Sequence, residues 1–448
     1  MNKTRKLKIV NARMVNEGTI FNGELLIHGK YIERIGSDLS DSDFNEIFDA
    51  KGMHILPGLI DDQVHFREPG LTHKATIESE SKAAVAGGIT SYFEMPNTVP
   101  QTVTIEQWEE KNKRAAKSSY ANYAFMFGGT NDNIDQIRTL DTKRVPALKL
   151  FLGSSTGNML VDNPEILREI FSTTDLVIAV HCEDESTIKT NIENARAIYG
   201  ADIPIDQHPY IRSEEACYLS SSKAVALARE TGARLHVFHI STAKELALFQ
   251  NDIPLEQKKI TAEVCTHHLW FSDEDYTSKG SRIKWNPAVK KITDREALWD
   301  ALNCNLIDVL ATDHAPHTRE EKNNKYEQCP SGGPLVQHAL PALLTAYHSG
   351  KITLEKIVEK ACHNPAILFD VEKRGYIRAG YFADLVFVDV NKLWEVKSED
   401  VLYQCGWTPF EGETFRGKVM KTLLNGQWVY DGNEVAKISA AMPLTFVR

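Results

Sequence analysis

Residues 57–70 read Pro-Gly-Leu-Ile-Asp-Asp-Gln-Val-His-Phe-Arg-Glu-Pro-Gly, an apolar segment followed directly by a histidine and an arginine. Side chains alternate along an extended segment, so residues 63 and 65 point to the same side. Two histidines at these positions would bind one metal ion, but the first position holds Gln63. Arg67 is always charged and suits bidentate binding of a carboxylate. The segment therefore predicts a metal site beside a carboxylate anchor.

Eight apolar runs alternate with helical segments in the middle of the chain. The first run ends at Asp61, and the others span residues 89–95, 123–127, 147–152, 176–180, 235–240, 260–265 and 307–311. Helix starts between the runs are marked by capping boxes and one first-turn proline, namely Thr104 with Gln107, Thr242 with Glu245, Thr293 with Glu296, and Pro164 after Asn163. Such alternation is most simply closed as an α/β fold of the (β/α)8 TIM-barrel type, with its chemistry at the C-terminal strand ends.

Both ends of the chain carry short strands separated by tight turns. These strands span residues 7–10, 25–28, 31–35, 384–388, 421–424 and 427–430. Neither end alone supplies enough strands for a stable sheet. We therefore expect residues 1–55 plus 375–448 to build one small β-sandwich domain, and residues 56–374 to form the metal-dependent catalytic barrel.

The composition narrows the choice of partners and compartment. With 42% hydrophobic and 25% charged residues, the chain has the composition of an ordinary globular protein rather than a disordered one. A formal charge of -10 argues against nucleic acid or an anionic membrane as the main partner. Seven widely spaced cysteines suit reduced thiols. Since no apolar run reaches the roughly 18 residues of a membrane span, we expect a cytoplasmic protein.

Polar side chains follow or end most of the apolar runs, where barrel chemistry belongs. They are His65 after the first run, Asn97 after the second, Lys149 within the fourth, His181 after the fifth, His239 in the sixth and Asp313 after the eighth. A single histidine at a strand end is usually a hydrogen-bonded structural residue. Their coincidence at matching strand ends instead predicts a shared metal site.

Lys149 stands among apolar neighbours that include Leu148 and Leu150. A buried ammonium there is unfavourable, so the lysine is either paired with a structural carboxylate or loses its proton. A neutral amine takes up carbon dioxide to form a carbamate, which offers two oxygen ligands to metal ions. Lys149 is therefore a candidate bridging ligand.

Taken together, these motifs resemble the cyclic amidohydrolases, and most closely the dihydroorotases. The matching segments are residues 57–70, 95–98, 149–151, 239–243, 286–287, 312–317, 364–366 and 380–386. The resemblance implies reversible, metal-dependent hydrolysis of dihydroorotate to N-carbamoyl-aspartate in pyrimidine biosynthesis. It also implies a small-molecule substrate and a possible homodimer.

The resemblance further implies a role for each residue of the site. His65 and Asp313 would bind one zinc ion. His181 and His239 would bind a second, and Lys149, carboxylated by CO2, would bridge the two. Asp313 would also be the catalytic residue, which carries a proton from the attacking nucleophile to the departing ring nitrogen.

A second group of residues would bind the substrate. Arg67, Asn97 and His317 are expected to hold its carboxylate. Asn286 is expected to contact the ring, or else it is a turn residue before Pro287. Hydantoin has no carboxylate to pair with Arg67, and an unpaired arginine in a dehydrated pocket is unfavourable. The arginine therefore favours dihydroorotate.

Gln63 departs from the family pattern, in which a histidine occupies this position. An amide oxygen binds zinc more weakly than an imidazole, so one or two ions are expected. Two alternatives follow: an inactive dihydroorotase-like scaffold, and a cyclic amidase of the allantoinase or hydantoinase type.

Two local questions also stay open. The glycine-rich residues 153–158 form either a lid or a static loop, and a structural role explains His267 and His268 equally well.

Overall fold

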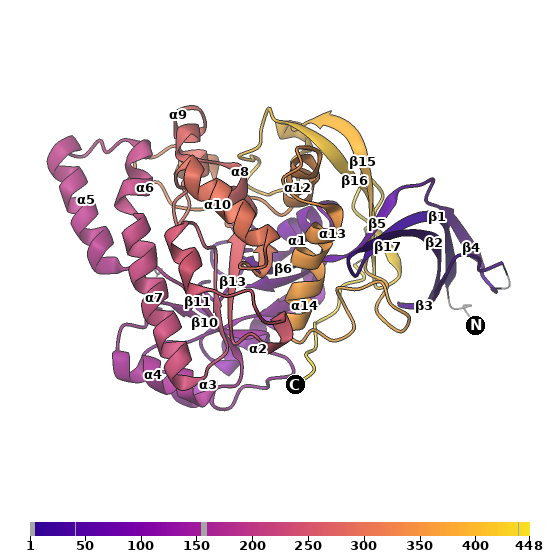
Figure 1. The fold of residues 1–448 in the computed structure, drawn as a ribbon, viewed down its shortest axis with the longest axis horizontal. Coiled ribbons are helices and arrows are strands. Elements are labelled where there is room, and N and C mark those ends of the chain that lie inside the picture. Colours follow the sequence, from indigo (N-terminus) through magenta and orange to yellow (C-terminus); the bar gives the residue numbers. More distant parts are fainter. Residues whose placement is uncertain (1–4, 41, 154–158, 438) are drawn as a thin grey trace.

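The computed structural model describes residues 5–40, 42–153, 159–437 and 439–448. Figure 1 shows a barrel surrounded by helices on one side and the N-terminal strands on the other. The predicted (β/α)8 barrel with a small β domain from both termini is confirmed. In the described part of the chain, no helix is long and apolar enough to cross a membrane.

The barrel wall consists of parallel strands that coincide with the eight predicted apolar runs. They are β6 (Leu59–Val64), β7 (Ile89–Glu94), β8 (Asn122–Phe125), β9 (Phe127–Gly128), β10 (Ala147–Phe151), β11 (Val177–His181), β12 (Leu235–Val237), β13 (Ile260–Cys265) and β14 (Val309–Ala311). Short β8 and β9 follow one another and share one position in the wall, since β8 pairs with β7 and β9 with β10. A parallel bridge between Val64 and His314 closes the barrel.

Helices connect the strands and cover the outside of the barrel (Figure 1). The longer ones are α1 (Ile77–Ala86), α2 (Ile105–Ser118), α4 (Pro164–Thr173), α5 (Glu185–Tyr199), α7 (Glu214–Thr231), α10 (Ile292–Asn303) and α12 (Ala339–His348). The shorter ones are α3 (Ile134–Ile137), α6 (His208–Ile211), α8 (Thr266–Trp270), α9 (Tyr276–Lys279), α11 (Arg319–Lys322), α13 (Leu354–Val358) and α14 (Asn364–Leu368).

The predicted helix starts are correct at two of the four places. Thr104 caps α2 and Asn163 caps α4 through their side chains. The Thr242–Glu245 hydrogen bonds form, but only a short 3-10 turn follows them. The prediction at Thr293 is wrong, because α10 begins at Ile292 after Lys291. Asp294 in its first turn accepts a hydrogen bond from the backbone of Ala243 instead, which ties the helix start to the end of the sixth strand.

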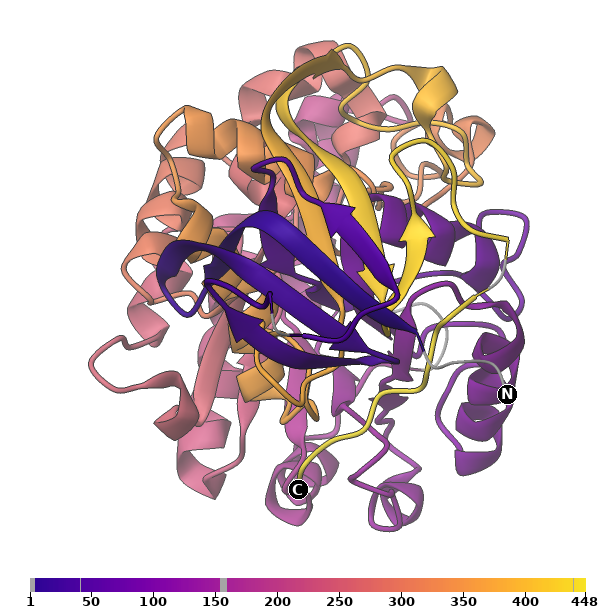
Figure 2. The same cartoon turned by 90° about the vertical axis from the view of Figure 1, so that its right-hand side faces the viewer.

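Both termini contribute to one eight-stranded sheet. Its strands are β1 (Lys6–Asn16), β2 (Thr19–His28), β3 (Tyr31–Gly36), β4 (Glu46–Asp49), β5 (His54–Pro57), β15 (Leu385–Glu395), β16 (Thr414–Leu424) and β17 (Gln427–Tyr430). The order is β17-β16-β15-β5-β1-β2-β3, and the eighth strand, β4, pairs with β1 outside this path. The N-terminal and C-terminal strands meet where β5 pairs with β15. Figure 2 shows the indigo and yellow strands side by side. Because β5 leads directly into β6, this sheet also positions the first barrel strand.

The last residues of the chain leave the sheet and return to the barrel. Tyr123, near the start of β8, exchanges backbone hydrogen bonds with Met442 and Leu444. Leu444 and Phe446 are buried in a core cluster with Phe93 inside the barrel. The C-terminal segment therefore closes the N-terminal end of the barrel strands, opposite the end that carries the polar residues. The domain division at residues 55/56 and 374/375 stays a prediction.

Candidate functional site

A cavity of about 270 Å³ opens at the C-terminal ends of the barrel strands. Every residue that the sequence predicted for the site contributes to its wall: Gln63, His65, Arg67, Asn97, Lys149, His181, His239, Asn286, Asp313 and His317. The barrel topology explains this convergence, because parallel strands end at the same rim and most of these residues lie near or just beyond a strand end, whereas Asn286 comes from the long connection between β13 and β14.

His181 and His239 form a close pair of imidazoles in the cavity. Nδ1 of His181 lies 3.0 Å from Nε2 of His239, and both side chains are buried. Ligand atoms about 2.1 Å from a tetrahedral zinc ion lie about 3.4 Å apart, so these two nitrogens fit neighbouring positions around one ion. The sequence analysis missed Glu183, which is fully buried and lies 3.1 Å from Nε2 of His181. Its carboxylate also pairs with Arg212 and orients the imidazole.

Lys149 projects from β10 into the centre of the barrel. Its side chain is 1% exposed, and among the described residues none forms a hydrogen bond with Nζ. Nζ lies 4.1 Å from the ring centroid of Phe238. Burial lowers the pKa of Lys149 to about 7. A substantial neutral fraction at physiological pH is the form that reacts with carbon dioxide, so the structure suits a carbamate at this position.

His65 and Asp313 lie next to each other in the cavity wall, just beyond the ends of the neighbouring strands β6 and β14. Nε2 of His65 lies 3.3 Å from Oδ1 of Asp313. On the other side of the ring, Nδ1 of His65 lies 2.8 Å from Oδ1 of Asn97, so it donates its proton there and leaves Nε2 for a ligand. Burial raises the pKa of Asp313 to about 7. Gln63 lies on the same wall, where its Oε1 is 3.8 Å from Sγ of Cys265.

Three residues of the site have a backbone conformation that side chains rarely adopt. The φ angles of Arg67, His239 and Asp313 are 67°, 41° and 50°. Non-glycine residues with positive φ are uncommon and cost of order 1–3 kcal/mol each when they are strained. Each of the three follows a strand directly or closely. The chain thus bends sharply as it leaves the sheet, and the bend turns the side chain into the cavity.

Arg67 forms a cationic part of the cavity wall. Its Nε donates a hydrogen bond to the carbonyl of Pro316, and a terminal nitrogen lies 3.0 Å from Nε2 of His317. Burial lowers the pKa of Arg67 to about 10, so the guanidinium stays charged at neutral pH. Burial, reinforced by Arg67, holds the pKa of His317 well below its usual value. Within the described ranges no carboxylate forms an ion pair with Arg67, so the wall suits an anionic ligand.

The remaining histidines near the cavity have structural contacts. His267 stacks on Trp285 with ring centroids 4.3 Å apart. Nε2 of His268 lies 3.1 Å from the carbonyl oxygen of Pro287. These contacts hold the segment that carries Asn286 against the barrel. Residues 154–158 of the glycine-rich loop lie outside the described residues.

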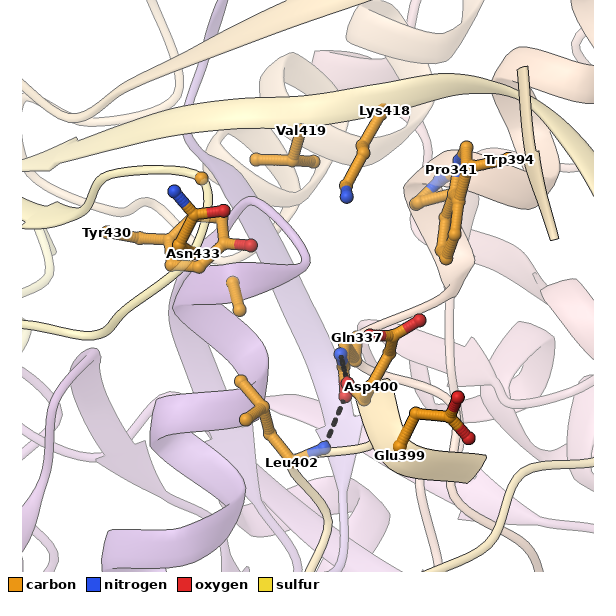
Figure 3. A pocket seen from close by; sticks show the side chains of 12 residues that line it. Gln337, Pro341, Trp394, Glu399, Asp400, Leu402, Lys418, Val419, Tyr430 and Asn433 are labelled. Carbon is orange, nitrogen blue, oxygen red and sulfur yellow. Dashed lines mark hydrogen bonds between the residues drawn. The ribbon is translucent and has the colours of Figure 1, made fainter. Parts of the chain in front are cut away.

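A second pocket lies away from these residues, beside β15, β16 and the start of α12. Figure 3 shows Trp394, Asp400, Lys418 and Tyr430 around it. The amide of Gln337 is already used within the protein, since it donates to the carbonyl of Asp400 and accepts from the backbone of Leu402. This pocket has none of the convergent imidazoles of the barrel cavity.

Comparisons with known proteins agree with this geometry. The sequence model of the Amidohydrolase family matches residues 54–429. The dihydroorotase of Halobacterium salinarum is 35% identical over 432 residues, which cover 95% of this chain and 98% of that protein. The dihydroorotase of Pyrococcus abyssi is 33% identical over 430 residues, which cover 95% and 96%.

Among solved structures, the L-hydantoinase (dihydropyrimidinase) of Arthrobacter aurescens superposes with a TM-score of 0.92. It is 26% identical, and the match covers 99% of this chain and 100% of that one. The dihydropyrimidinase of Brevibacillus agri superposes with a TM-score of 0.88 at 23% identity, and its match also covers 99% of this chain and 100% of that one.

The zinc affinity of the metal-stripped protein should fall as the pH drops below about 7. Asp313 and Lys149 both have a pKa near 7 because of burial, and a carboxyl or amine group can act as a metal ligand only without its proton. His65 and His239, whose pKa values burial holds well below normal, stay neutral and do not compete. Titration with Zn²⁺ should give at least about tenfold weaker binding one unit below this pKa than one unit above it. Equal affinities would contradict these protonation states.

Proposed function

Because the chain belongs to the amidohydrolase family, we propose that it is a dihydroorotase, which opens the ring of dihydroorotate to N-carbamoyl-aspartate and closes it again. Relatives of that name match almost the whole chain at 33–35% identity. The observation that carries the proposal is the charged Arg67 in the wall of a cavity built from His65, Lys149 and Asp313. It supplies an anchor for a ring carboxylate beside groups suited to amide hydrolysis.

Zinc is the metal that we assign to the cavity, in one or two ions. The nitrogens of His181 and His239, which are 3.0 Å apart, would hold one zinc ion. Lys149, once carboxylated, would supply a further oxygen ligand. His65 and Asp313 support the other, where Gln63 offers only an amide oxygen. When bound, zinc polarises the amide carbonyl and activates water for attack.

Asp313 is the group that we assign to proton transfer. It takes the proton from the attacking water and delivers it to the ring nitrogen as the amide bond breaks. The pKa of about 7 that burial produces lets one carboxyl group act as base and then as acid near neutral pH. In the reverse direction the same group removes the proton from the nitrogen of N-carbamoyl-aspartate.

Arg67 and His317 are the groups that we assign to the substrate carboxylate. The hydrogen bond to Pro316 holds Arg67 by its Nε, and the terminal nitrogens, one of which also contacts Nε2 of His317, keep further N–H groups for a bidentate contact. Asn97 lies beside them but already accepts a hydrogen bond from His65, so its amide nitrogen is the part that turns to substrate. Asn286 is assigned to the ring from the opposite wall.

Hydantoin hydrolysis is the second candidate, and the likeness to the Arthrobacter aurescens L-hydantoinase favours it. The charge of the cavity favours dihydroorotate, because a neutral ring leaves Arg67 buried without an anionic partner. The scaffold alternative is not needed to explain Gln63, since the groups for proton transfer and substrate binding are all present. The homodimer and the cytoplasmic location stay predictions.

Replacement of Arg67 by alanine should abolish the preference for dihydroorotate. Loss of a buried charge contact costs about 2–4 kcal/mol, which lowers kcat/KM for dihydroorotate by about thirtyfold or more. Turnover of neutral hydantoin should change little. Assays of dihydroorotate, hydantoin and allantoin on one preparation measure this preference, with the exposed Arg138→Ala as control. An unchanged preference for dihydroorotate would contradict the role of Arg67 as the carboxylate anchor. If the native protein turned over none of the three rings, the result would favour an inactive dihydroorotase-like scaffold.

Asp313→Asn should lower kcat by about 10²–10⁴-fold, the usual contribution of a general acid and base. The amide has nearly the same shape and still offers an oxygen, so the fold and bound zinc should persist. Metal analysis and circular dichroism on the same sample check both. Turnover close to that of the native protein would exclude Asp313 as the proton carrier.

A further inference from the structure

We propose that Asp62, His236 and Glu263 form an additional cation site inside the barrel, for a divalent first-row transition metal such as zinc. None of the three lines the catalytic cavity. The site is therefore separate from the ions that the proposed reaction uses, and its existence does not depend on which ring the protein opens.

The three residues come from three strands of the barrel wall, and β14 alone separates β6 from β13. His236 and Glu263 lie in the neighbouring strands β12 and β13, whereas Asp62 lies in β6. All three side chains are 0% exposed. His236 precedes His239 by three residues and Asp62 precedes Gln63 by one. The cluster thus lies in the barrel interior, deeper than the residues at the strand ends.

The distances between the ligand atoms suit one bound ion. Nε2 of His236 lies 3.3 Å from Oδ2 of Asp62 and 3.8 Å from Oε2 of Glu263. One ligand atom from each residue lies within 4.8 Å of the other two. In a tetrahedral zinc site with bonds of about 2.1 Å, neighbouring ligand atoms are about 3.4 Å apart. Small rotations of side chains would bring all three into coordination.

The polar atoms of the cluster lack hydrogen-bond partners. In the described part of the chain, the ion-pair contacts of Nε2 of His236 with Asp62 and Glu263 are the partners found for these atoms, and no further hydrogen-bond donor reaches either carboxylate oxygen of Asp62 or Oε2 of Glu263. Buried carboxylates normally accept several hydrogen bonds, and leaving them without donors is strongly unfavourable. Burial and the neighbouring Asp62 raise the pKa of Glu263, so two carboxyl groups that converge in a dry interior without donors need either a proton or a metal ion between them.

The orientation of His236 matches that of a metal-bound histidine. Its Nδ1 lies 2.8 Å from Oγ1 of Thr261, whose hydroxyl donates to the carbonyl of Leu235 at 3.2 Å. Nδ1 of His236 is therefore the donor, and Nε2 is directed at the carboxylates. Histidines that bind metals usually donate their other ring N–H in this way, which fixes the tautomer.

A proton on His236 is the competing source of positive charge. Burial lowers the pKa of His236, but the neighbouring Asp62 and Glu263 outweigh it and raise the pKa to about 9. Without a metal ion, an imidazolium at His236 and a proton on Glu263, whose pKa burial and Asp62 raise, would neutralise the cluster but leave most of its oxygen atoms without donors. A divalent cation with a neutral His236 balances both carboxylates, and it supplies each unpartnered atom with a ligand bond.

The ion would stabilise the catalytic cavity from the barrel interior, through the backbone that carries His239. Oε1 of Glu263 accepts the backbone N–H of His239 at 3.1 Å, the residue whose φ is 41°. A cation on Oε2 would hold the carboxylate in place and, through it, the bent backbone that directs His239 into the cavity. Asp62 would tie the adjacent Gln63 in the same way. The role is therefore structural positioning rather than chemistry.

Anomalous diffraction at the zinc edge tests this site directly. Crystals of the full chain, soaked in Zn²⁺ alone, should show a peak between Asp62, His236 and Glu263, at bonding distance of about 2.0–2.2 Å from each. This peak should be additional to those near Lys149. Peaks confined to the cavity, with His236 hydrogen-bonded to both carboxylates, would overturn the proposal. Peak positions do not depend on turnover, so failure of the dihydroorotase assignment leaves this result interpretable.

A variant gives the matching measurement in solution. Asp62→Asn should bind one zinc equivalent fewer per chain than the native protein and keep the metal held at Lys149. Asp308→Asn is the control, because Asp308 is a buried barrel carboxylate that pairs with Lys258 rather than with a histidine. If Asp62→Asn does not fold, His236→Gln replaces it. An unchanged zinc count in a folded variant would overturn the proposal.

Discussion

The burial of the Lys149 amine is the constraint on which the site depends. Nothing in the described chain forms a hydrogen bond with Nζ, and its neighbours on β10 and β12 are apolar. A charged ammonium is unfavourable there, which explains a pKa near 7 and favours carbamate formation. The same dry environment raises the pKa of Asp313 and keeps His65 and His239 neutral. One physical condition thus favours the neutral forms of Lys149, His65 and His239 and brings the pKa of Asp313 into the range in which it exchanges a proton near neutral pH.

The strand-end residues were predictable because each one interrupts or follows an apolar run. His65, His181 and Asp313 gave such a signal, and parallel strand ends necessarily meet at one rim. Residues that support the site gave no such signal in the sequence. Glu183 lies in a loop after the strand, and its contact with Arg212 depends on the fold of α6. The closing of the barrel by the C-terminal segment was also invisible, since residues 443–448 carry no periodic pattern.

The interior cluster was missed for a different reason. His236 and Glu263 lie within apolar runs and Asp62 directly follows one, and each taken alone reads as an ordinary strand residue. Only the closure of the barrel between β14 and β6 brings Asp62 near His236 and Glu263. The structure also gives Gln63 a clearer setting. The amide of Gln63 lies where the family has a histidine, and the adjacent Asp62 lies in the barrel interior. In the proposed arrangement, Gln63 weakens the metal position at His65 and Asp313, whereas Asp62 supplies a ligand for the interior cation.

The buried guanidinium of Arg67 selects the substrate by binding the carboxylate of its ring. A crystal structure with dihydroorotate bound in the zinc-loaded protein tests it most directly. The account predicts that both carboxylate oxygens lie within about 3 Å of the terminal nitrogens of Arg67, with the ring amide turned toward Lys149 and Asp313. A ring bound with its carboxylate toward solvent, and Arg67 in contact only with Pro316 and His317, would contradict it.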